Sequence, residues 1–332
     1  MLFLLAAFVP MTQAQRPAEW RNASAAEQAQ DTVAFAGIDQ AIREDSPDVQ
    51  SAVVVWQGRV VYQFYRDGSP DTLRNVHSVS KSALSTLTGI ALGQGHLASL
   101  DERIVSLVPE WAGLNPDPRA AAITVRHLLT MTAGFEVNDP TGTATAGHPQ
   151  DMWKRPMRDD PGRAFAYDNA LIPMLSVVLE RATGMSVPDY ARRHLVGPLA
   201  LGEPSYQQGL SMRTLDMAKL GQLYLQNGVW AGQQILPEAY VHDATRPQSA
   251  GGLPLSLPYG YMWWVVRSNA VRPTFMAAGY GGQFVWVYPP LDLVMATTSA
   301  VSRESLQRFQ AMKLIRGRLF AAAQQRAKEP SR

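Results

Sequence analysis

Strand-like segments lie near both ends of the 332-residue chain, and the long stretch between them is predicted to be mostly helical. Near the N-terminus, Gln50 to Trp56 and Val60 to Tyr65 are rich in β-branched and aromatic residues, and the short Gln57-Gly58-Arg59 link favours a hairpin. Four more strand-like runs follow toward the C-terminus: Tyr261 to Arg267, Thr274 to Ala278, Gln283 to Tyr288 and Leu293 to Thr298. This order predicts an α/β (α+β) fold. One antiparallel sheet is formed from the N- and C-terminal segments and flanked by helices, with a mostly helical lobe inserted at about residues 82–250.

Outside these strands, the chain shows helical periodicity interrupted by glycine and proline. Six segments are expected to be helices: Val33 to Arg43, Ser78 to Leu92, Ile123 to Met131, Asn169 to Ala182, Leu215 to Gln226 and Ser305 to Gln324. Residues 136–165, in contrast, show no periodicity and contain scattered glycines and prolines. Because so long a structureless segment in a compact domain is usually functional, we expect it to form the rim or lid of a pocket.

Charge and cysteine content exclude several classes of protein. Thirty Lys and Arg residues against 28 Asp and Glu give a formal charge of +2, which offers no electrostatic basis for binding nucleic acid or an anionic membrane. The chain has no cysteine, so a disulfide framework, a thiolate zinc site and a cysteine nucleophile are excluded. Its six histidines show no metal-ligand spacing. We therefore expect neither a metal site nor a nucleic-acid partner.

The first fourteen residues resemble a secretory signal peptide. Met1 to Ala14 carry no charge, and the apolar run from Leu2 to Val9 is too short to span a bilayer. Small residues at Thr12 and Ala14 fit a cleavage site after Ala14. A short, buried N-terminal helix is the alternative. The signal-peptide interpretation predicts a periplasmic or secreted protein whose residues 15–332 form a single domain.

A serine and a lysine three residues apart mark the start of the helix at Ser78. In Ser78-Val79-Ser80-Lys81, this spacing places the hydroxyl and the amine on the same helical face. Lys81 is the only formally charged residue between Ser78 and Leu100, and the apolar residues around it predict a helix buried nearly all round. Burial lowers the pKa of a lysine, and a neutral amine can act as the base for a serine nucleophile. Alternatively, Ser78 is an ordinary N-cap and Lys81 extends its amine to solvent.

Two further motifs offer groups that fit beside this pair. Tyr167-Asp168-Asn169 stands directly before a helix, where the Tyr167 phenol can relay a proton and the Asn169 amide can hold the lysine or a substrate carbonyl. In Gly279-Tyr280-Gly281-Gly282, the glycines permit close approach of a ligand, and a main-chain N–H there can pair with that of Ser78 as an oxyanion hole. Each motif also has a purely structural explanation. The first can be a helix-capping asparagine beside a core tyrosine, and the second a plain β-bulge or turn.

Taken in order, the three motifs resemble those of the serine beta-lactamase-like superfamily, which includes class C beta-lactamases and penicillin-binding proteins. The class C branch carries S-x-x-K, Y-x-N and a Lys/His-Thr-Gly strand. Residues 78–81, 167–169 and 277–279 stand at the matching positions here. The resemblance extends over roughly residues 35–320. It implies a beta-lactamase/transpeptidase-like fold, a covalent acyl-enzyme on Ser78, an oxyanion hole that uses the N–H of Tyr280, and no metal or cofactor.

The third motif departs from the pattern of that branch. Ala277 and Ala278 stand where class C enzymes and penicillin-binding proteins have a cation and a hydroxyl, which help those relatives to hold a substrate carboxylate. The string Gly-Tyr-Gly-Gly-Gln resembles instead the esterases and 6-aminohexanoate-dimer hydrolase-type amidases of the superfamily.

We therefore expect a serine hydrolase whose partner is a small-molecule ester or amide. Two alternatives remain: a penicillin-recognising enzyme, such as a beta-lactamase or a D-alanyl-D-alanine carboxypeptidase, and a non-catalytic cell-wall-binding or scaffold member of the fold. The sequence predicts no oligomeric state.

Overall fold

An eight-stranded antiparallel sheet, in the order β2-β1-β12-β11-β10-β9-β8-β7, forms the centre of the protein. The structure is a computed structural model and describes residues 20–137, 147–266 and 271–328. The strands of the sheet are β1 (Val49–Trp56), β2 (Arg59–Tyr65), β7 (Ser249–Gly252), β8 (Leu257–Tyr259), β9 (Trp264–Val266), β10 (Thr274–Gly279), β11 (Gln283–Tyr288) and β12 (Leu293–Ser299). Two short ribbons lie outside it: β3 (Arg74–Asn75) with β4 (Ser211–Met212), and β5 (Val229–Trp230) with β6 (Gln233–Gln234).

The two ends of the chain meet inside this sheet. Strand β1 pairs with β12 along its whole length, with Val54 opposite Met295. The predicted hairpin joins β1 to β2, and both Gln57 and Gly58 in its turn have positive φ, as tight hairpin turns require. The sheet built from both terminal segments and flanked by helices confirms the predicted fold class.

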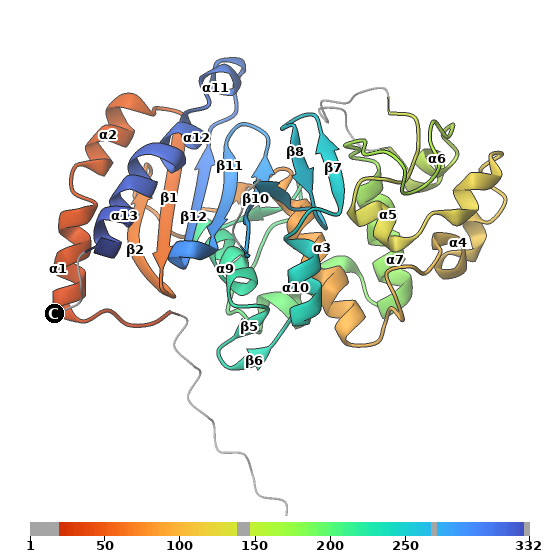
Figure 1. Cartoon of the computed structure of the whole chain (residues 1–332), viewed down its shortest axis with the longest axis horizontal. Coiled ribbons are helices and arrows are strands. Elements are labelled where there is room, and N and C mark those ends of the chain that lie inside the picture. The colour runs from red at the N-terminus through yellow and green to blue at the C-terminus, as the bar shows by residue number, and fades with distance from the viewer. Residues whose placement is uncertain (1–19, 138–146, 267–270, 329–332) are drawn as a thin grey trace, which may run out of the picture.

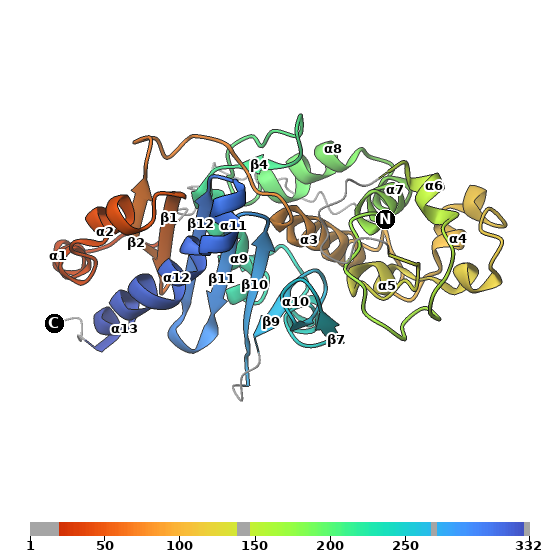
Figure 2. The same cartoon turned by 90° about the horizontal axis from the view of Figure 1, so that it is seen from above.

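Helices cover both faces of the sheet (Figures 1 and 2). One face carries α1 (Ala25–Ala34), α2 (Ile38–Asp45), α11 (Arg303–Arg308), α12 (Gln310–Leu314) and α13 (Phe320–Lys328). Against the other face lie α3 (Val79–Gly93) and α9 (Thr214–Leu225), with α10 (Glu238–Ala244) beside α3. We call the first of these the outer face and the second the inner face.

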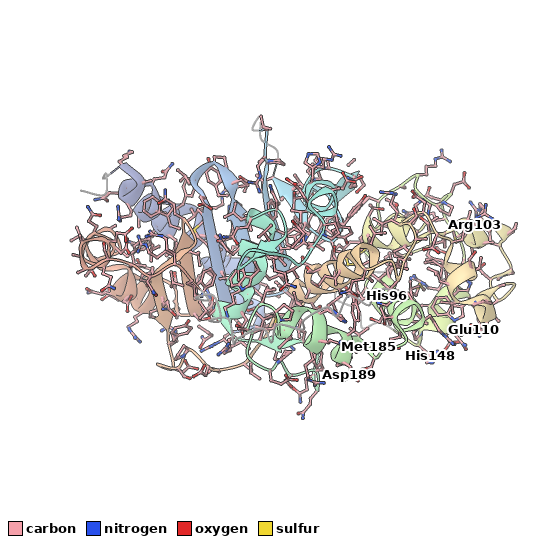
Figure 3. All side chains as sticks on the ribbon, turned by 90° about the horizontal axis from the view of Figure 1, so that it is seen from below. His96, Arg103, Glu110, His148, Met185 and Asp189 are labelled. Atoms are coloured by element: carbon pink, nitrogen blue, oxygen red, sulfur yellow. The ribbon has the colours of Figure 1, made fainter. Side chains whose placement is uncertain are left out.

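A group of shorter helices projects from one end of the sheet as a lobe (Figure 1). It consists of α4 (Ile104–Leu107), α5 (Val125–Leu129), α6 (Pro149–Trp153), α7 (Leu171–Thr183) and α8 (Val187–Ala191). Thr124 caps α5 by accepting a hydrogen bond from the main-chain N–H of His127. The lobe presents polar side chains to solvent, among them the exposed His96, Arg103, Glu110 and His148 (Figure 3).

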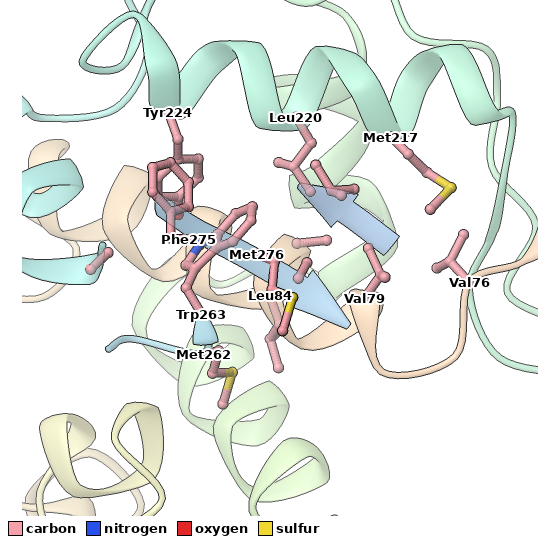
Figure 4. Close-up of a cluster of buried hydrophobic side chains, with 14 of the residues drawn as sticks. Val76, Val79, Leu84, Met217, Leu220, Tyr224, Met262, Trp263, Phe275 and Met276 are labelled. Carbon is pink, nitrogen blue, oxygen red and sulfur yellow. The ribbon is translucent and has the colours of Figure 1, made fainter. Parts of the chain in front are cut away.

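An aromatic and aliphatic cluster fixes α3 and α9 against the inner face. Tyr224, Leu220 and Met217 project from α9 toward strand residues such as Phe275 (Figure 4). The Tyr224 ring lies 4.6 Å from that of Trp263, which in turn makes an edge contact with Phe275 at 5.3 Å. This packing holds the first turns of α3 at the end of β10.

Two predicted helices are interrupted in the structure. The helix expected from Val33 to Arg43 is divided between α1 and α2 at Gly37, whose φ of +74° is left-handed. The closing helix expected from Ser305 to Gln324 is broken at Phe309, with a φ of +49°, and continues through a π-helical turn, Ile315–Leu319. Hydrophobic periodicity does not report such local changes of backbone conformation, because the apolar face continues on both sides of the break.

The predicted signal peptide, residues 1–14, lies outside the described residues. Within the described ranges, no helix combines the length and the apolar character that crossing a membrane requires.

Candidate active site

The chain makes a sharp turn directly before α3. The N–H of Val76 donates to Leu210 O at 2.9 Å, which holds the segment beside β4. His77 then adopts a φ of +47°, and its N–H donates to Asn75 Oδ1 at 2.8 Å. A non-glycine residue at positive φ stores strain that the surrounding structure has to hold. Ser78 therefore enters the helix from a fixed and strained turn.

Ser78 and Lys81 are in direct contact. Lys81 Nζ lies 2.7 Å from Ser78 Oγ and donates a hydrogen bond to it. Ser78 occupies the N-cap position of α3, but its side chain makes no capping hydrogen bond. Lys81 is only 5% exposed, so the alternative in which its amine reaches solvent is wrong. Most residues of α3 are buried, as the sequence predicts.

Burial lowers the pKa of Lys81 to about 7, opposed by the nearby carboxylate of Asp168. Asp168 is itself buried and forms an ion pair with Arg155, and its Oδ1 accepts from the N–H of Ala170 at 2.9 Å. These partners hold the carboxylate in place and counter its charge. A substantial fraction of the Lys81 amine is therefore neutral at neutral pH, as a proton acceptor has to be.

Tyr167 lies against both members of the pair. Lys81 Nζ is 4.9 Å from the centroid of the Tyr167 ring, which stacks on Trp264 at 5.7 Å. Burial raises the pKa of Tyr167 to about 12, opposed by a hydrogen bond with the Ser78 side chain. The phenol therefore keeps its proton at neutral pH and lies beside the Ser78 hydroxyl.

Asn169 lies in the turn that leads from Tyr167 into α7. Its main-chain carbonyl accepts from the N–H of Ile172 at 3.2 Å, and its side chain is half-buried. The N-cap of α7 is Ala170 and not Asn169, so the helix-capping alternative for this asparagine is wrong.

The glycine-rich turn after β10 packs against the segment that leads to Ser78. A Cβ atom on Gly279 would lie 2.4 Å from the carbonyl oxygen of Val76, so only glycine fits there. Gly281 and Gly282 follow with φ of +82° and +108°. Within the described part of the chain, neither the N–H of Ser78 nor that of Tyr280 donates to a main-chain acceptor.

Gln283 holds this turn from the inside. Its buried side-chain amide donates to Tyr280 O at 3.2 Å and to Ser299 O at 2.9 Å, and it accepts from Ser299 N–H at 3.0 Å. These bonds fix the main chain at Tyr280 relative to β12.

We predict that Gly279→Ala lowers the free energy of unfolding by about 1–3 kcal/mol, because the added methyl group overlaps main-chain atoms that cannot move away. Urea denaturation measures the loss. Gly317→Ala is the matched control, since a Cβ atom there would meet nothing within 4 Å. Equal unfolding midpoints for the two variants would contradict the close approach of β10 to Val76.

A cavity of about 350 Å³ opens beside Ser78 and Tyr167. Its walls are the glycine-rich turn, Trp264, Ala278 and the α11–α12 segment, including Leu306, Phe309 and Met312. Asp48 is the one charged residue among the described residues that line it, and Arg308 Nε donates to the Asp48 carboxylate at 2.8 Å. The described lining of the cavity therefore offers a mainly apolar surface to a ligand, with no basic side chain in it.

The segment predicted to form the rim, residues 136–165, contributes none of the cavity-lining residues in its described part. Trp153 is buried in the lobe, 5.2 Å from the ring of Trp111, and its indole N–H donates to Trp111 O. Residues 138–146 lie outside the described residues. The wall comes instead from α11 and α12, because the break at Phe309 bends this segment over the end of the sheet.

From the sequence, Gln283 was named as the end of the glycine-rich string without its role in holding the turn, and Arg155 and the α11–α12 segment were missed as parts of this site. The glutamine that ends the glycine-rich string was a usable signal, since a polar residue at a strand start needs partners if buried. No sequence signal links Arg155 to Asp168, or residues 305–312 to Ser78, because these contacts depend on the tertiary fold.

Known proteins resemble large parts of this chain. The 6-aminohexanoate-dimer hydrolase of Paenarthrobacter ureafaciens is 24% identical over 303 residues, covering 79% of this chain and 75% of that protein. Esterase EstB of Burkholderia gladioli is 27% identical over 190 residues, covering 49% of this chain and 48% of that protein. The solved structure of EstCE1, a hydrolase with promiscuous acyltransferase activity, has a TM-score of 0.68 at 16% identity and covers 92% of this chain and 100% of its own.

The family assignment follows from a match to a whole-family model. The model described as Beta-lactamase matches residues 38–314, which include the Ser78–Lys81 pair, Tyr167 and the glycine-rich turn. The relatives named above are hydrolases, and the shared fold agrees with the architecture of the sheet and its helices. The protein therefore belongs to the beta-lactamase family of hydrolases.

Proposed function

We propose that the protein is a serine hydrolase that cleaves a small ester or amide through a covalent acyl-enzyme on Ser78. One observation carries the proposal: Lys81 Nζ lies 2.7 Å from Ser78 Oγ, and burial lowers the pKa of this amine to about 7. A neutral amine at that distance can take the hydroxyl proton as the nucleophile attacks. The hydrolase relatives support the same reaction class.

Acylation begins when Ser78 Oγ attacks the substrate carbonyl carbon and its proton passes to Lys81 Nζ. The carbonyl oxygen becomes an oxyanion, which the N–H groups of Ser78 and Tyr280 stabilise. When the intermediate collapses, the bond to the leaving group breaks, and the proton passes from Lys81 through the Tyr167 hydroxyl to the leaving oxygen or nitrogen. Lys81 is then neutral again.

Deacylation repeats the same proton transfers with water as the nucleophile. Lys81, acting with Tyr167, removes a proton from water as its oxygen attacks the acyl carbon, and Ser78 Oγ leaves and regains a proton. In this proposal Asn169 orients Lys81 and the substrate carbonyl. The apolar walls of the cavity, including Trp264 and Ala278, hold the substrate.

A fluorophosphonate probe tests the proposal directly. The probe should label the wild-type protein at Ser78, and peptide mass spectrometry locates the adduct. An unlabelled, folded protein that does not hydrolyse p-nitrophenyl acetate would favour the non-catalytic scaffold alternative. Benzylpenicillin should leave the intact mass unchanged, because Ala277 and Ala278 supply no cation or hydroxyl for its carboxylate. A stable penicilloyl adduct would favour the penicillin-recognising alternative.

Removal of the Tyr167 hydroxyl should slow turnover on the order of 10²-fold, because the leaving group then lacks its proton relay. Tyr167→Phe keeps the ring that stacks on Trp264, so the fold should be retained. Steady-state kcat with p-nitrophenyl butyrate measures the effect. Tyr190→Phe is a matched control, since burial raises the pKa of Tyr190 to about 12 as well, and its hydroxyl contacts Gln94 in the lobe. Similar rates for both variants would exclude Tyr167 from the proton relay.

A further inference from the structure

The cavity beside Ser78 continues into an apolar groove on the outer face of the sheet. This groove has a volume of about 600 Å³ and shares Leu255 and Met312 with the cavity. Its other lining residues include Thr274, Met276, Trp286, Tyr288, Arg316 and Phe320. Cavity and groove therefore adjoin at Leu255 and Met312, and the cavity reaches the nucleophile proposed above.

Strand register places the strand residues of the cavity and of the groove on the same face of the sheet. Alternate residues of a strand face the same side of a sheet, so Ala278, Met276 and Thr274 of β10 share the outer face. In the neighbouring strand β11, Phe284 lies opposite Ala278, and Trp286 lies opposite Met276. Ala278 and Phe284 line the cavity, whereas Met276 and Trp286 line the groove. The apolar stripe therefore runs along the strands away from Ser78, for about 13 Å between Ala278 and Thr274 at 3.3 Å per residue.

The helices on this face leave the stripe partly uncovered. Helix α12 contacts β11 and β12, and the groove is lined by residues of α12 and of strands β8 to β12. Trp286, Tyr288, Met312 and Phe320 are each only half-buried. Among the described residues that line the groove, Arg316 is the one charged residue, and it is exposed to solvent. A strip of methionine and aromatic side chains with a single charged residue suits a flexible hydrocarbon chain.

We propose that this groove binds the acyl chain of the substrate, and that the protein is selective for esters of medium- to long-chain fatty acids. The inference rests on the proposed function, because the acyl carbon is placed at Ser78 and the chain extends from there past Leu255 and Met312. Each methylene that moves from water into the groove favours binding by about fourfold. The one charged residue among the described residues that line the cavity is the acid Asp48, so no lining side chain would attract an anionic acyl group.

A chain-length series of p-nitrophenyl esters on the wild-type protein tests the proposal. We expect kcat/KM to rise at least tenfold from butyrate to octanoate or dodecanoate, each assayed below its aggregation concentration. A value that falls steeply beyond butyrate, with acetate and butyrate still hydrolysed, would overturn the groove proposal and leave the serine hydrolase intact. If no ester is turned over and the fluorophosphonate probe fails to label Ser78, the proposed function fails and the inference fails with it.

A blocked groove provides the second test. Met312→Trp places a larger side chain where cavity and groove meet, so kcat/KM for dodecanoate relative to acetate should fall at least tenfold. Met185→Trp is the matched control, because this half-buried methionine lies on the lobe, away from the sheet (Figure 3).

Thermal denaturation checks that both variants fold. If Met312→Trp does not fold, the chain-length series on the wild-type protein decides alone. An unchanged ratio in folded Met312→Trp would contradict the proposal. A second result would also contradict the proposal: kcat/KM of the wild type does not change with chain length, and the wild type forms a dimer that Met312→Trp abolishes. That result would assign the groove to a second copy of this chain.

Discussion

Ser78→Ala is expected to lower kcat/KM for p-nitrophenyl butyrate by about 10⁴-fold or more and to prevent labelling by a fluorophosphonate. The reason is the loss of the one hydroxyl that contacts both Lys81 and Tyr167. The fold should be retained, because the Ser78 side chain makes no capping hydrogen bond to α3. Activity and probe labelling are measured on protein whose thermal denaturation matches that of the wild type.

Ser80→Ala is the control for this variant, since the same atom is removed two residues further along the helix. Ser80 lies on a different side of α3, where it lines a separate cavity with Ala83 and Leu87. Labelling and turnover of Ser80→Ala should match those of the wild type. If Ser78→Ala keeps wild-type turnover, Ser78 is not the nucleophile and the acyl-enzyme proposal is wrong.

Lys81→Met should reduce kcat by about 10²–10⁴-fold, because it removes the proton acceptor beside Ser78 while keeping a side chain of similar length. Fluorophosphonate labelling should slow in parallel, since the same base assists that reaction. A variant that retains wild-type kcat would show that another group accepts the proton.

The wild-type pH profile tests the same amine without a substitution. Burial lowers the pKa of Lys81 to about 7, and only the neutral amine accepts a proton. We therefore expect kcat/KM to rise with pH through an inflection near 7 and to reach a plateau above it. Tyr167, whose pKa burial raises to about 12, stays protonated across this range. A profile that is flat from pH 5 to 9 would contradict Lys81 as the base.

The same lowered pKa should make Lys81→Met more stable than the wild type. Between pH 7 and the ordinary lysine pKa of 10.5, the unfolded chain binds a proton at Lys81 that the folded protein does not. Wild-type stability therefore falls as the pH falls from 10.5 to 7 and stays low below that. Since a tenfold change in proton affinity corresponds to about 1.4 kcal/mol, the variant should gain a few kcal/mol at pH 6. Urea denaturation at pH 6 and pH 9.5 should show the gain shrinking at the higher pH.

Features that depend on near neighbours in the chain were predictable from the sequence. The Ser78–Lys81 contact is an example, because a spacing of three residues within one helical turn places the two side chains on the same face, where they can meet. Likewise, the Gln57-Gly58 hairpin and the strands of both terminal segments follow from local patterns. The absence of charge around Lys81 also indicated burial, and hence the direction of its pKa change.

Other parts of the site depend on contacts between segments far apart in the chain. Gly279 meets Val76, and Arg155 holds Asp168, only once the sheet and the lobe have assembled. The cavity wall was predicted from residues 136–165 but comes from α11 and α12, since the broken backbone at Phe309 redirects a helix whose periodicity looks continuous.

The sequence by itself thus determined the fold class and the placing of Ser78 and Lys81 on one helical turn, because these follow from the order of strand-like and helical segments and from local spacing. The family was indicated by the resemblance of three motifs taken in order. Only the tertiary structure decided which surface faces that pair. Strand register aligns Ala278 with Met276 and Trp286, and the path of α12 leaves this stripe open. Burial and register arise from the whole assembled sheet, so no single stretch of the sequence specifies them.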